Sequence, residues 1–264
     1  MSSSTVSSKR SSKTASKSGN PLRINRFLAD AGLGSRRKVE ELITGGKIML
    51  NGEVCMDLSA VIDSDKDEVS FEGKPLSAKK QMMYLILNKP RGYIVSRADE
   101  LKRNTVYELL PDSARNLSYA GRLDKNSEGL LMFTNDGDMI NKLTHPNFKV
   151  EKVYRVDIDR KLNRSQLDQL RKGVVIEGGM TLPAGVFVKT ETDTSMTLKM
   201  VITEGRKRQI RQMIEAVGAK VRSLRRLQFG ALRLKELPLG NWRPLTEQEI
   251  RYLKHTPDKG RSKK

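Results

Sequence analysis

The chain has 264 residues, a formal net charge of +19 and a sequence pI of about 10.0. A charge of this size points to a polyanionic partner, and nucleic acid is the usual one. One Cys and two His exclude an internal disulfide and leave no zinc site built from these residues. No apolar run is long enough to span a bilayer, so the sequence predicts a soluble, cytoplasmic protein with no membrane partner.

Residues 1–20 are rich in Ser, Lys, Thr and Arg and predict a disordered basic tail, because they offer almost nothing to bury. Beyond this tail, apolar residues recur at the spacing of an amphipathic helix, at Ile24, Phe27, Leu28 and Ala31. Ser35 is a favourable N-cap for a second helix. Alternating stretches around Asn51-Gly52 then predict a hairpin. Together these elements predict a small domain at residues 21–72.

Three cations, Arg36, Arg37 and Lys38, stand in the first turn of the second predicted helix. The helix dipole disfavours cations there by roughly 0.3–1 kcal/mol each. With the free N–H groups of the helix start they could bind RNA phosphate, although a solvated basic face would show the same pattern. We expect this module to position RNA and to do no chemistry.

Residues 73–81 contain Lys74-Pro75 and Lys79-Lys80 and predict a linker to a second domain at residues 82–254. In that domain we expect strands near residues 83–87, 130–134, 153–158, 185–188 and 196–201. We expect helices near residues 137–143, 165–172, 206–217 and 247–253. Because strands and helices mix without regular βαβ alternation, the predicted fold class is α+β with a mixed, largely antiparallel sheet. Residues 255–264 predict a basic C-terminal tail.

The block GRLDKNSEGLLMFTND, residues 121–136, is the main candidate for chemistry. Its Asp124 stands on a polar turn just before an apolar run, which is how a preorganised nucleophile or base is usually held. Between Arg122 and Lys125 this carboxylate is expected to stay ionised. An Asp in an ordinary surface turn would show the same pattern. The chain has no Walker loop and no GxGxxG after a strand, so we expect no cofactor and no metal.

Six segments follow one another in an order that carries more information than any one of them. They are NKPRGYIVS (88–96), RNTVYELLP (103–111), the GRLD block, KVYRVDI (152–158), EGRKRQIRQMIEAVG (204–218) and LRRLQFGAL (224–232). Together they resemble the pseudouridine synthases that modify bacterial ribosomal RNA and carry an N-terminal S4 RNA-binding domain. The resemblance runs from about residue 22 to about residue 253 and implies an S4-like domain followed by a synthase catalytic domain.

The resemblance implies isomerisation of uridine to pseudouridine within RNA. Asp124 would be the nucleophile, acting on the ribose or starting glycal formation, on a uridine flipped out of its stack. Tyr154 would lie against the uracil, and Arg211, on the border of a buried helix stripe, would pair with Asp124. Leu224 would pack in the active site. Taken singly, these last three residues also fit an ordinary strand Tyr, a surface helix Arg and a core Leu.

Further roles concern RNA contacts. By the same resemblance, Arg122 would fill the gap that the flipped base leaves. Arg206, Lys207 and Arg208 would occupy the first turn of the helix expected at residues 206–217 and bind phosphates. The expected partner is ribosomal RNA, more like that of the large-subunit members of the family, and the expected state is a monomer.

Two other functions fit part of this pattern. A ribosome-assembly factor that binds ribosomal RNA without catalysis would show the same net charge and the same S4-like module. It would have no reason to combine Asp124, Tyr154 and Arg211. A hydrolase would need a second carboxylate, for which Asp136 and Asp138 are candidates, but their Asn-Asp-Gly-Asp setting is typical of a turn.

Overall fold

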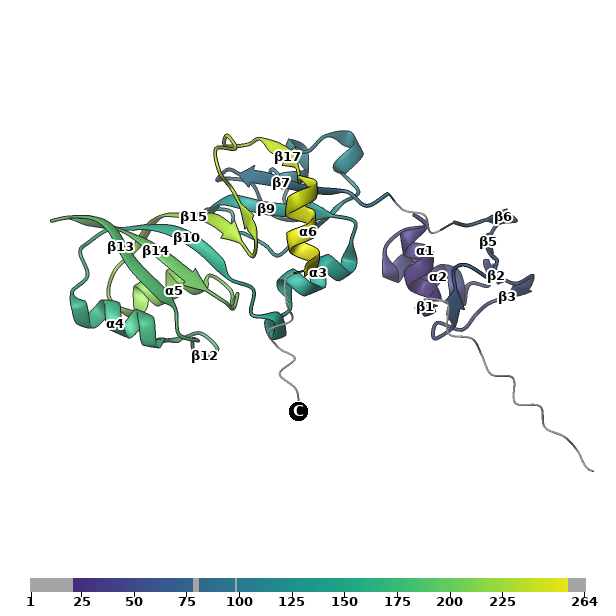
Figure 1. Ribbon diagram of the computed structural model, residues 1–264, viewed down its shortest axis with the longest axis horizontal. Coiled ribbons are helices and arrows are strands. Elements are labelled where there is room, and N and C mark those ends of the chain that lie inside the picture. The colour runs from purple at the N-terminus through teal and green to yellow at the C-terminus, as the bar shows by residue number, and fades with distance from the viewer. Residues whose placement is uncertain (1–20, 78–80, 98, 256–264) are drawn as a thin grey trace, which may run out of the picture. The chain divides into compact units, whose positions relative to one another are not determined.

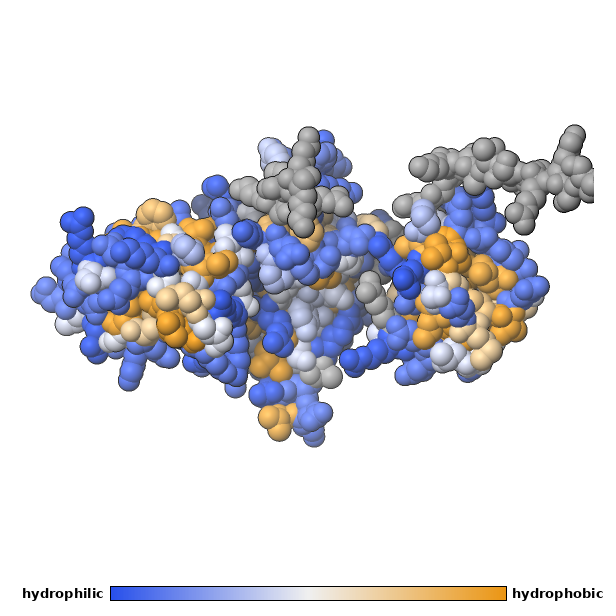
Figure 2. All heavy atoms as spheres, turned by 90° about the horizontal axis from the view of Figure 1, so that it is seen from below, coloured by the Kyte–Doolittle hydropathy of each residue, from blue (hydrophilic) through white to orange (hydrophobic). Residues whose placement is uncertain are grey.

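The computed structural model describes residues 21–77, 81–97 and 99–255, so the tail expected at residues 1–20 lies outside the described residues. Of the C-terminal tail, only His255 is described, and it ends the last helix. The chain divides into two compact units, Met1–Gln81 and Met82–Lys264, which are considered separately below (Figure 1). The visible face in Figure 2 is largely hydrophilic, as the net charge of +19 leads one to expect.

The N-terminal unit combines two helices with short strands. Its elements are β1 (Pro21–Arg23), α1 (Ile24–Asp30), α2 (Arg36–Thr44), β2 (Ile48–Leu50), β3 (Glu53–Val54), β4 (Val61–Asp63), β5 (Val69–Phe71) and β6 (Lys74–Pro75). Strands β3-β2-β5-β6 form one sheet and β1 pairs with β4. Apolar residues from both helices and from β2, β4 and β5 meet in one core, which also buries Cys55.

Local signals explain these elements. Ser35 caps α2, since its Oγ accepts a hydrogen bond from the Lys38 backbone N–H at 3.3 Å. Gly32 follows α1 with φ +92°, a conformation that favours glycine. The expected hairpin forms at Asn51-Gly52. The linker expected from residue 73 is corrected in part, because Lys74-Pro75 pairs with β5 as an edge strand, and residues 78–80 lie outside the description.

The C-terminal unit begins with an antiparallel pair that is extended by later segments. Its elements are β7 (Tyr84–Lys89), the 3₁₀ turns η1 (Val106–Leu109) and η2 (Asp112–Ala114), β8 (Ser118–Ala120), β9 (Glu128–Thr134), α3 (Gly137–Thr144), η3 (Pro146–Phe148), β10 (Lys152–Ile158), α4 (Arg164–Lys172), β11 (Val175–Ile176), β12 (Gly179–Met180), β13 (Gly185–Thr192), β14 (Ser195–Ile202), α5 (Gln209–Ala216), β15 (Val221–Phe229), β16 (Leu232–Arg233), β17 (Trp242–Pro244) and α6 (Glu247–His255).

The main sheet has the order β13-β14-β10-β15-β9-β7-β17, with β8 and β16 paired at its side. All of its pairings are antiparallel except that between β15 and β9. The expected α+β fold with a mixed, largely antiparallel sheet is therefore confirmed. Neither unit contains a described helix that is long and apolar enough to cross a membrane.

Two hydrophobic cores cover opposite faces of the strands β7 and β9. Leu131 and Phe133 belong to the core that includes α4 and α5, while Leu130 and Met132 belong to the core that includes α3 and α6. This alternation follows from the two-residue period of a strand. It explains why the segment GLLMF is apolar at every position: helices or turns lie against both faces, so no side chain reaches solvent.

The single parallel contact in the sheet depends on Gly129. Its φ is +104°, and a Cβ built at this position would lie 2.3 Å from the carbonyl oxygen of Arg226 on β15. No side chain fits at that distance, so only glycine lets β9 and β15 approach this closely. The loop that carries Asp124 leads directly into this crossing.

Candidate active site

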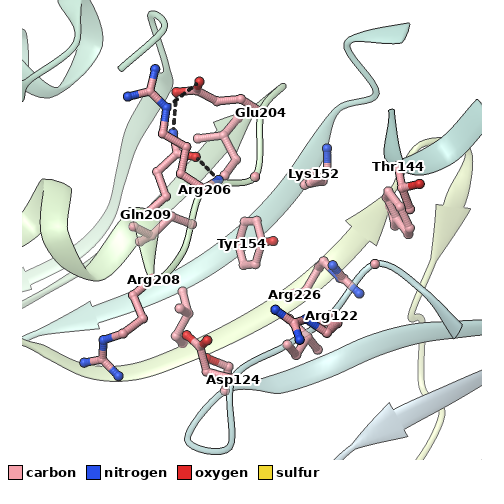
Figure 3. Close-up of a pocket in the computed structure, with 18 of the residues that line it drawn as sticks. Arg122, Asp124, Thr144, Lys152, Tyr154, Glu204, Arg206, Arg208, Gln209 and Arg226 are labelled. Carbon is pink, nitrogen blue, oxygen red and sulfur yellow. Dashed lines mark hydrogen bonds and ion pairs between the residues drawn. The ribbon is translucent and has the colours of Figure 1, made fainter. Parts of the chain in front are cut away.

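A cavity of about 200 Å³, open to solvent, lies where the loop between β8 and β9 meets β10, α5 and β15. Among the residues lining it are Arg122, Asp124, Tyr154 and Leu224. These four come from three separate parts of the sequence, and Figure 3 shows Asp124 and Tyr154 bordering the same space. The cavity thus gathers the four residues predicted from the sequence as nucleophile, base-stacking Tyr, apolar contact and intercalating Arg.

The turn carrying Asp124 is fixed by backbone hydrogen bonds. The Ser127 N–H donates to the carbonyl oxygen of Asp124 at 3.0 Å, and the Gly92 N–H donates to that of Lys125 at 2.9 Å. These bonds tie the turn to itself and to the loop after β7. Because the backbone is fixed, the Asp124 side chain is presented to the cavity from a rigid support.

A buried lysine, Lys89, supports the same turn from the end of β7. Its side chain has 0% exposure, and its ammonium group donates to the carbonyl oxygens of Ser127 at 2.9 Å and Asp124 at 3.2 Å. It also donates to Pro90 at 2.9 Å and to Lys125 at 3.4 Å. Burial lowers the pKa of Lys89 to about 8, although the carboxylates of Asp124 and Glu128 oppose the shift.

Arg211 supports the turn from α5 in a different way from the one predicted. No ion pair joins it to Asp124 among the described residues. Its Nη2 instead donates to the carbonyl oxygen of Asn126 at 2.9 Å, and its Nη1 donates to that of Val221 at 3.4 Å. Burial lowers the pKa of Arg211, as does the charge of Arg208, and the nearby Asp124 carboxylate opposes the shift. The direct pairing is therefore corrected: the guanidinium donates to backbone carbonyl oxygens, one of which belongs to the turn that carries Asp124.

Tyr154 occupies the middle of the sheet, on β10. It faces Met200 of β14 and Arg226 of β15 in the strand register and is 7% exposed. Its hydroxyl has no hydrogen-bond partner within the part of the chain that the structure describes. A ring held by its neighbours, with a hydroxyl available in a cavity, is suited to contact a planar substrate.

The basic segment before α5 differs from the prediction. The helix begins at Gln209, so Arg206, Lys207 and Arg208 precede it and do not form its first turn. Arg208 has φ +51°, which is incompatible with a helix that starts earlier. The Arg206 backbone N–H donates to the Gln209 side chain at 3.0 Å, and that side chain donates to the Glu204 carboxylate at 2.6 Å. These two bonds hold the segment between Glu204 and the start of α5.

The three cations of this segment also differ in their availability. The Arg206 guanidinium pairs with Glu204 at 3.2 Å and donates to three carbonyl oxygens around β12, including that of Met180 at 2.7 Å. It anchors the β11–β12 turn and has little capacity left for phosphate. Lys207 and Arg208 are exposed, and Arg208 lines the cavity.

In the N-terminal unit, Arg37 and Lys38 are exposed at the start of α2, where the sequence placed them. Lys38 also forms an ion pair with Glu41 at 3.4 Å. The side chain of Arg36 lies outside the described part of the structure. Arg37 and Lys38 remain available to an anion near the first turn of the helix.

Three cations at the site were missed in the sequence: the buried Lys89 and Arg226 and the half-buried Lys152. The position of Lys89 at the end of an apolar strand was a signal in the sequence for a structural role, because Lys is almost never fully buried without a specific partner.

The two carboxylates that a hydrolase would use, Asp136 and Asp138, lie away from the cavity. Asp136 caps α3, accepting from the Met139 N–H at 3.0 Å and the Tyr84 hydroxyl at 2.8 Å. No cluster of metal-binding side chains occurs within the described ranges.

Comparison with known proteins fits this geometry. Residues 83–216 match the family model described as RNA pseudouridylate synthase, and residues 22–69 match that of the S4 domain. The chain belongs to the RNA pseudouridylate synthase family. It is therefore an RNA pseudouridine synthase, an isomerase, with an N-terminal S4 domain.

Relatives cover most of the chain. A protein of Aquifex aeolicus (strain VF5) named as an uncharacterized RNA pseudouridine synthase is 36% identical over 88% of this chain and 93% of its own length. The ribosomal large subunit pseudouridine synthase B of Bacillus subtilis (strain 168) is 34% identical over 91% of this chain and 98% of its own. A crystal structure of a pseudouridylate synthase superimposes with a TM-score of 0.62, at 30% identity, over 88% of this chain and 99% of that one.

Proposed function

We propose that this pseudouridine synthase modifies specific uridines of large-subunit ribosomal RNA, with Asp124 as the nucleophile. The observation that carries the proposal is the cavity in which Asp124, on its rigid turn, borders the same space as Tyr154 and Leu224. The choice of RNA is supported by the relatives named as large-subunit synthases and by the S4 domain. An enzyme acting on ribosomal RNA would work in the cytoplasm of a bacterial cell.

The reaction would begin with a uridine leaving its stack, at a cost of a few kcal/mol. Arg122 borders the cavity and would occupy the vacated position in the RNA. The base would enter between Tyr154 and Leu224, which are both less than a tenth exposed. The ribose would remain near the half-buried Asp124. The Asp124 carboxylate would then attack the ribose or start glycal formation, and the base would rotate and rejoin through C5.

The supports of Asp124 give the proposed nucleophile its position. Lys89 and Arg211 each donate to carbonyl oxygens of its turn, from β7 and α5 respectively. Holding a nucleophile in one geometry lowers the entropic part of the barrier. Arg211 would also add a positive field near the carboxylate, so it is proposed as a positioning residue that reaches the reaction through the turn.

The N-terminal unit would contribute affinity. Arg37 and Lys38 would bind phosphates without reading bases, and Lys207 and Arg208 would do the same beside the cavity. A non-catalytic assembly factor would use the same cations, but it would not need a carboxylate held in a cavity opposite a tyrosine.

The test is mapping of pseudouridine at single-base resolution in ribosomal RNA from cells with and without the protein. We expect one or a few large-subunit positions to lose pseudouridine in the deletion strain and to regain it when the gene is restored. Restoration with the Asp124→Asn variant serves as the matched control and should leave those positions unmodified. An unchanged map of both subunits would contradict the proposed ribosomal substrate.

A further inference from the structure

Two cations, the buried Arg226 and the half-buried Lys152, lie on the floor of the cavity next to Tyr154. Arg226 is the register partner of Tyr154 across β10 and β15. Lys152 precedes Tyr154 by two residues on the same strand, so the two side chains leave the same face. Both cations line the cavity. In Figure 3 they lie on the side of Tyr154 that faces Thr144.

Neither cation has a carboxylate partner. Arg226 is 2% exposed; its Nε donates to the carbonyl oxygen of Leu130 at 2.7 Å, whereas its Nη2 is buried and has no partner among the described residues. The Lys152 ammonium donates to the carbonyl oxygen of Val150 at 2.9 Å. No ion pair between described residues includes either of them.

The two charges are close to each other. Both lie over the ring of Phe229, with the Arg226 Cζ 4.8 Å and the Lys152 Nζ 5.7 Å from its centroid. Burial and, to a smaller extent, the charge of Arg226 together lower the pKa of Lys152 to about 8, while Glu204 opposes the shift. Glu204 is itself paired with Arg206. A buried guanidinium beside a half-buried ammonium, with no anion to pair with either, is costly, and the ring compensates only a small part of that cost.

This arrangement becomes favourable if the substrate supplies negative charge at the cavity floor. We propose that Arg226 and Lys152 stabilise the negative charge that develops on the uracil ring when its N1–C1′ bond breaks. The inference rests on the proposed function and adds two residues to it. Preorganised donors aimed at a developing charge in a water-poor site are among the largest contributions to enzymatic rates.

The electron pair of the N1–C1′ bond determines where the negative charge appears. As the bond between C1′ and N1 breaks, its electron pair stays on the ring and spreads over O2 and O4. The ribose C1′ is meanwhile bonded to the Asp124 carboxylate; in the other route the carboxylate takes the C2′ proton to give the glycal and returns it to C2′ when C5 bonds to C1′. The ring returns the pair when C5 bonds to C1′, after which the C5 proton is lost, N1 holds a proton and Asp124 is free again. No oxidant or reductant is needed.

The depth of Arg226 favours the uracil over a phosphate. Asp124 is half-buried, Tyr154 is 7% exposed and Arg226 is 2% exposed, so Arg226 lies at the most enclosed position of the three. A flipped nucleotide inserts its base furthest, while its phosphates stay with the strand at the mouth. The groups on the floor therefore meet the edge of the base. A phosphate site at the same cations is the alternative that the experiment must separate.

The experiment uses the full chain and a short RNA substrate, with Lys152→Gln and Arg226→Gln as test variants and Lys152→Arg as the conservative one. Lys172→Gln and Arg164→Gln, on the exposed surface of α4, make the same charge changes away from the cavity. With enzyme saturating, we expect the single-turnover rate to fall about 10-fold in Lys152→Gln and about 100-fold in Arg226→Gln, with little change in RNA Kd. Lys152→Arg should recover most of the rate, and both α4 variants should match the wild type.

A second substrate separates charge stabilisation from a structural role. In RNA carrying 5-fluorouridine at the target, the fluorine withdraws electrons and stabilises the ring anion itself. We expect the rate deficit of Lys152→Gln, measured as cleavage of the N1–C1′ bond, to narrow on this substrate. An equal deficit on both substrates, or full activity in both Gln variants, would overturn the inference.

A phosphate site would give a different result. In that case Kd would rise, the log–log salt slope of binding would fall by about 0.7–0.9 per lost contact, and the rate at saturation would not change. That outcome also rejects the uracil assignment. If Arg226→Gln does not fold, Lys152→Gln decides alone. If wild-type protein forms no pseudouridine in any ribosomal RNA, the proposed function has failed; if it does and both variants are fully active, only this inference has failed.

Discussion

The ammonium group of Lys89 lies 3.2 Å from the backbone carbonyl oxygen of Asp124. The contact joins the last residue of β7 to the turn before β9, and a second bond at 2.9 Å reaches the carbonyl oxygen of Ser127 within the same turn. One buried side chain thus holds both ends of the turn. The position of Asp124 therefore depends on a residue that needs no contact with substrate.

Replacing Lys89 should impair activity more than folding. In Lys89→Met the carbonyl oxygen of Ser127 loses its buried donor, at a cost of about 1–3 kcal/mol, whereas that of Asp124 keeps the Ser127 N–H. Removal of a desolvated charge offsets part of this cost. We expect a single-turnover rate at least 10-fold lower, since a displacement of about 1 Å can cost far more than that. Urea unfolding checks how much protein is folded. A folded Lys89→Met protein with wild-type rates would show that the ammonium does not position Asp124.

The rate should fall as the pH rises from 7 to 9. Burial lowers the pKa of Lys89 to about 8 and that of Lys152 to about 8, so both lose their charge in this interval. Both folded-state pKa values lie below the ordinary value, so these groups favour the folded state as the pH rises and the loss of rate is not unfolding. Single-turnover rates with circular dichroism at each pH test this. A rate that stays flat or rises up to pH 9 would contradict it.

In Lys152→Arg the guanidinium keeps its charge at pH 9, so one of the two titrations is removed. We expect this variant to lose less of its rate between pH 7 and 9 than the wild type, with the remainder due to Lys89. The comparison separates the two lysines without removing either positive charge at neutral pH.

Gly129→Ala should destabilise the C-terminal unit strongly. The new Cβ would lie 2.3 Å from the carbonyl oxygen of Arg226, and the backbone has φ +104°, so β9 and β15 would have to separate. We expect a loss of about 2–4 kcal/mol in the free energy of unfolding, from overpacking and backbone strain together. Gly137→Ala, at the start of α3 with nothing within 4 Å, is the control and should be close to neutral. Equal unfolding midpoints for the two variants would exclude this explanation of the close approach.

The cations at the start of α2 should control the salt dependence of RNA binding. In the double variant Arg37→Gln and Lys38→Gln, each lost phosphate contact should reduce the log–log slope of Kd against salt by about 0.7–0.9. The chemical rate at saturating enzyme should not change. The control is Lys66→Gln, which removes an exposed cation elsewhere in the same unit. A slope equal to that of the control variant would mean that α2 does not bind phosphate.

Much of this structure could be predicted because its signals are local. The spacing of Ile24, Phe27 and Leu28 and the cap at Ser35 determine α1 and α2 without reference to the rest of the chain. By contrast, β15 was not predicted as a strand, because its segment VRSLRRLQF carries three arginines that suggest exposure. Arg226 is nevertheless buried, through a bond to β9 and a ring from its own strand.

The site shows the same division. Sequence motifs identified Asp124, Tyr154 and Leu224 as a set, and in the structure all three line one cavity. The contact made by Arg211 could not be read from helix periodicity, which gives the face of a side chain but not the carbonyl or carboxylate that it reaches. Lys89 was missed because its burial depends on carbonyl oxygens far along the chain, in the turn around Asp124. Lys152 was missed because a strand pattern does not show which side chains line a cavity.

The most direct test of the central claim is the activity of Asp124→Asn on RNA labelled with tritium at C5 of uracil. The substitution keeps the size of the side chain and removes its charge, so folding and RNA affinity should remain close to those of the wild type. We predict that tritium release and pseudouridine formation fall below detection while Kd for the RNA changes by less than about threefold. Turnover at a rate comparable to the wild type would contradict the assignment of Asp124 as the nucleophile.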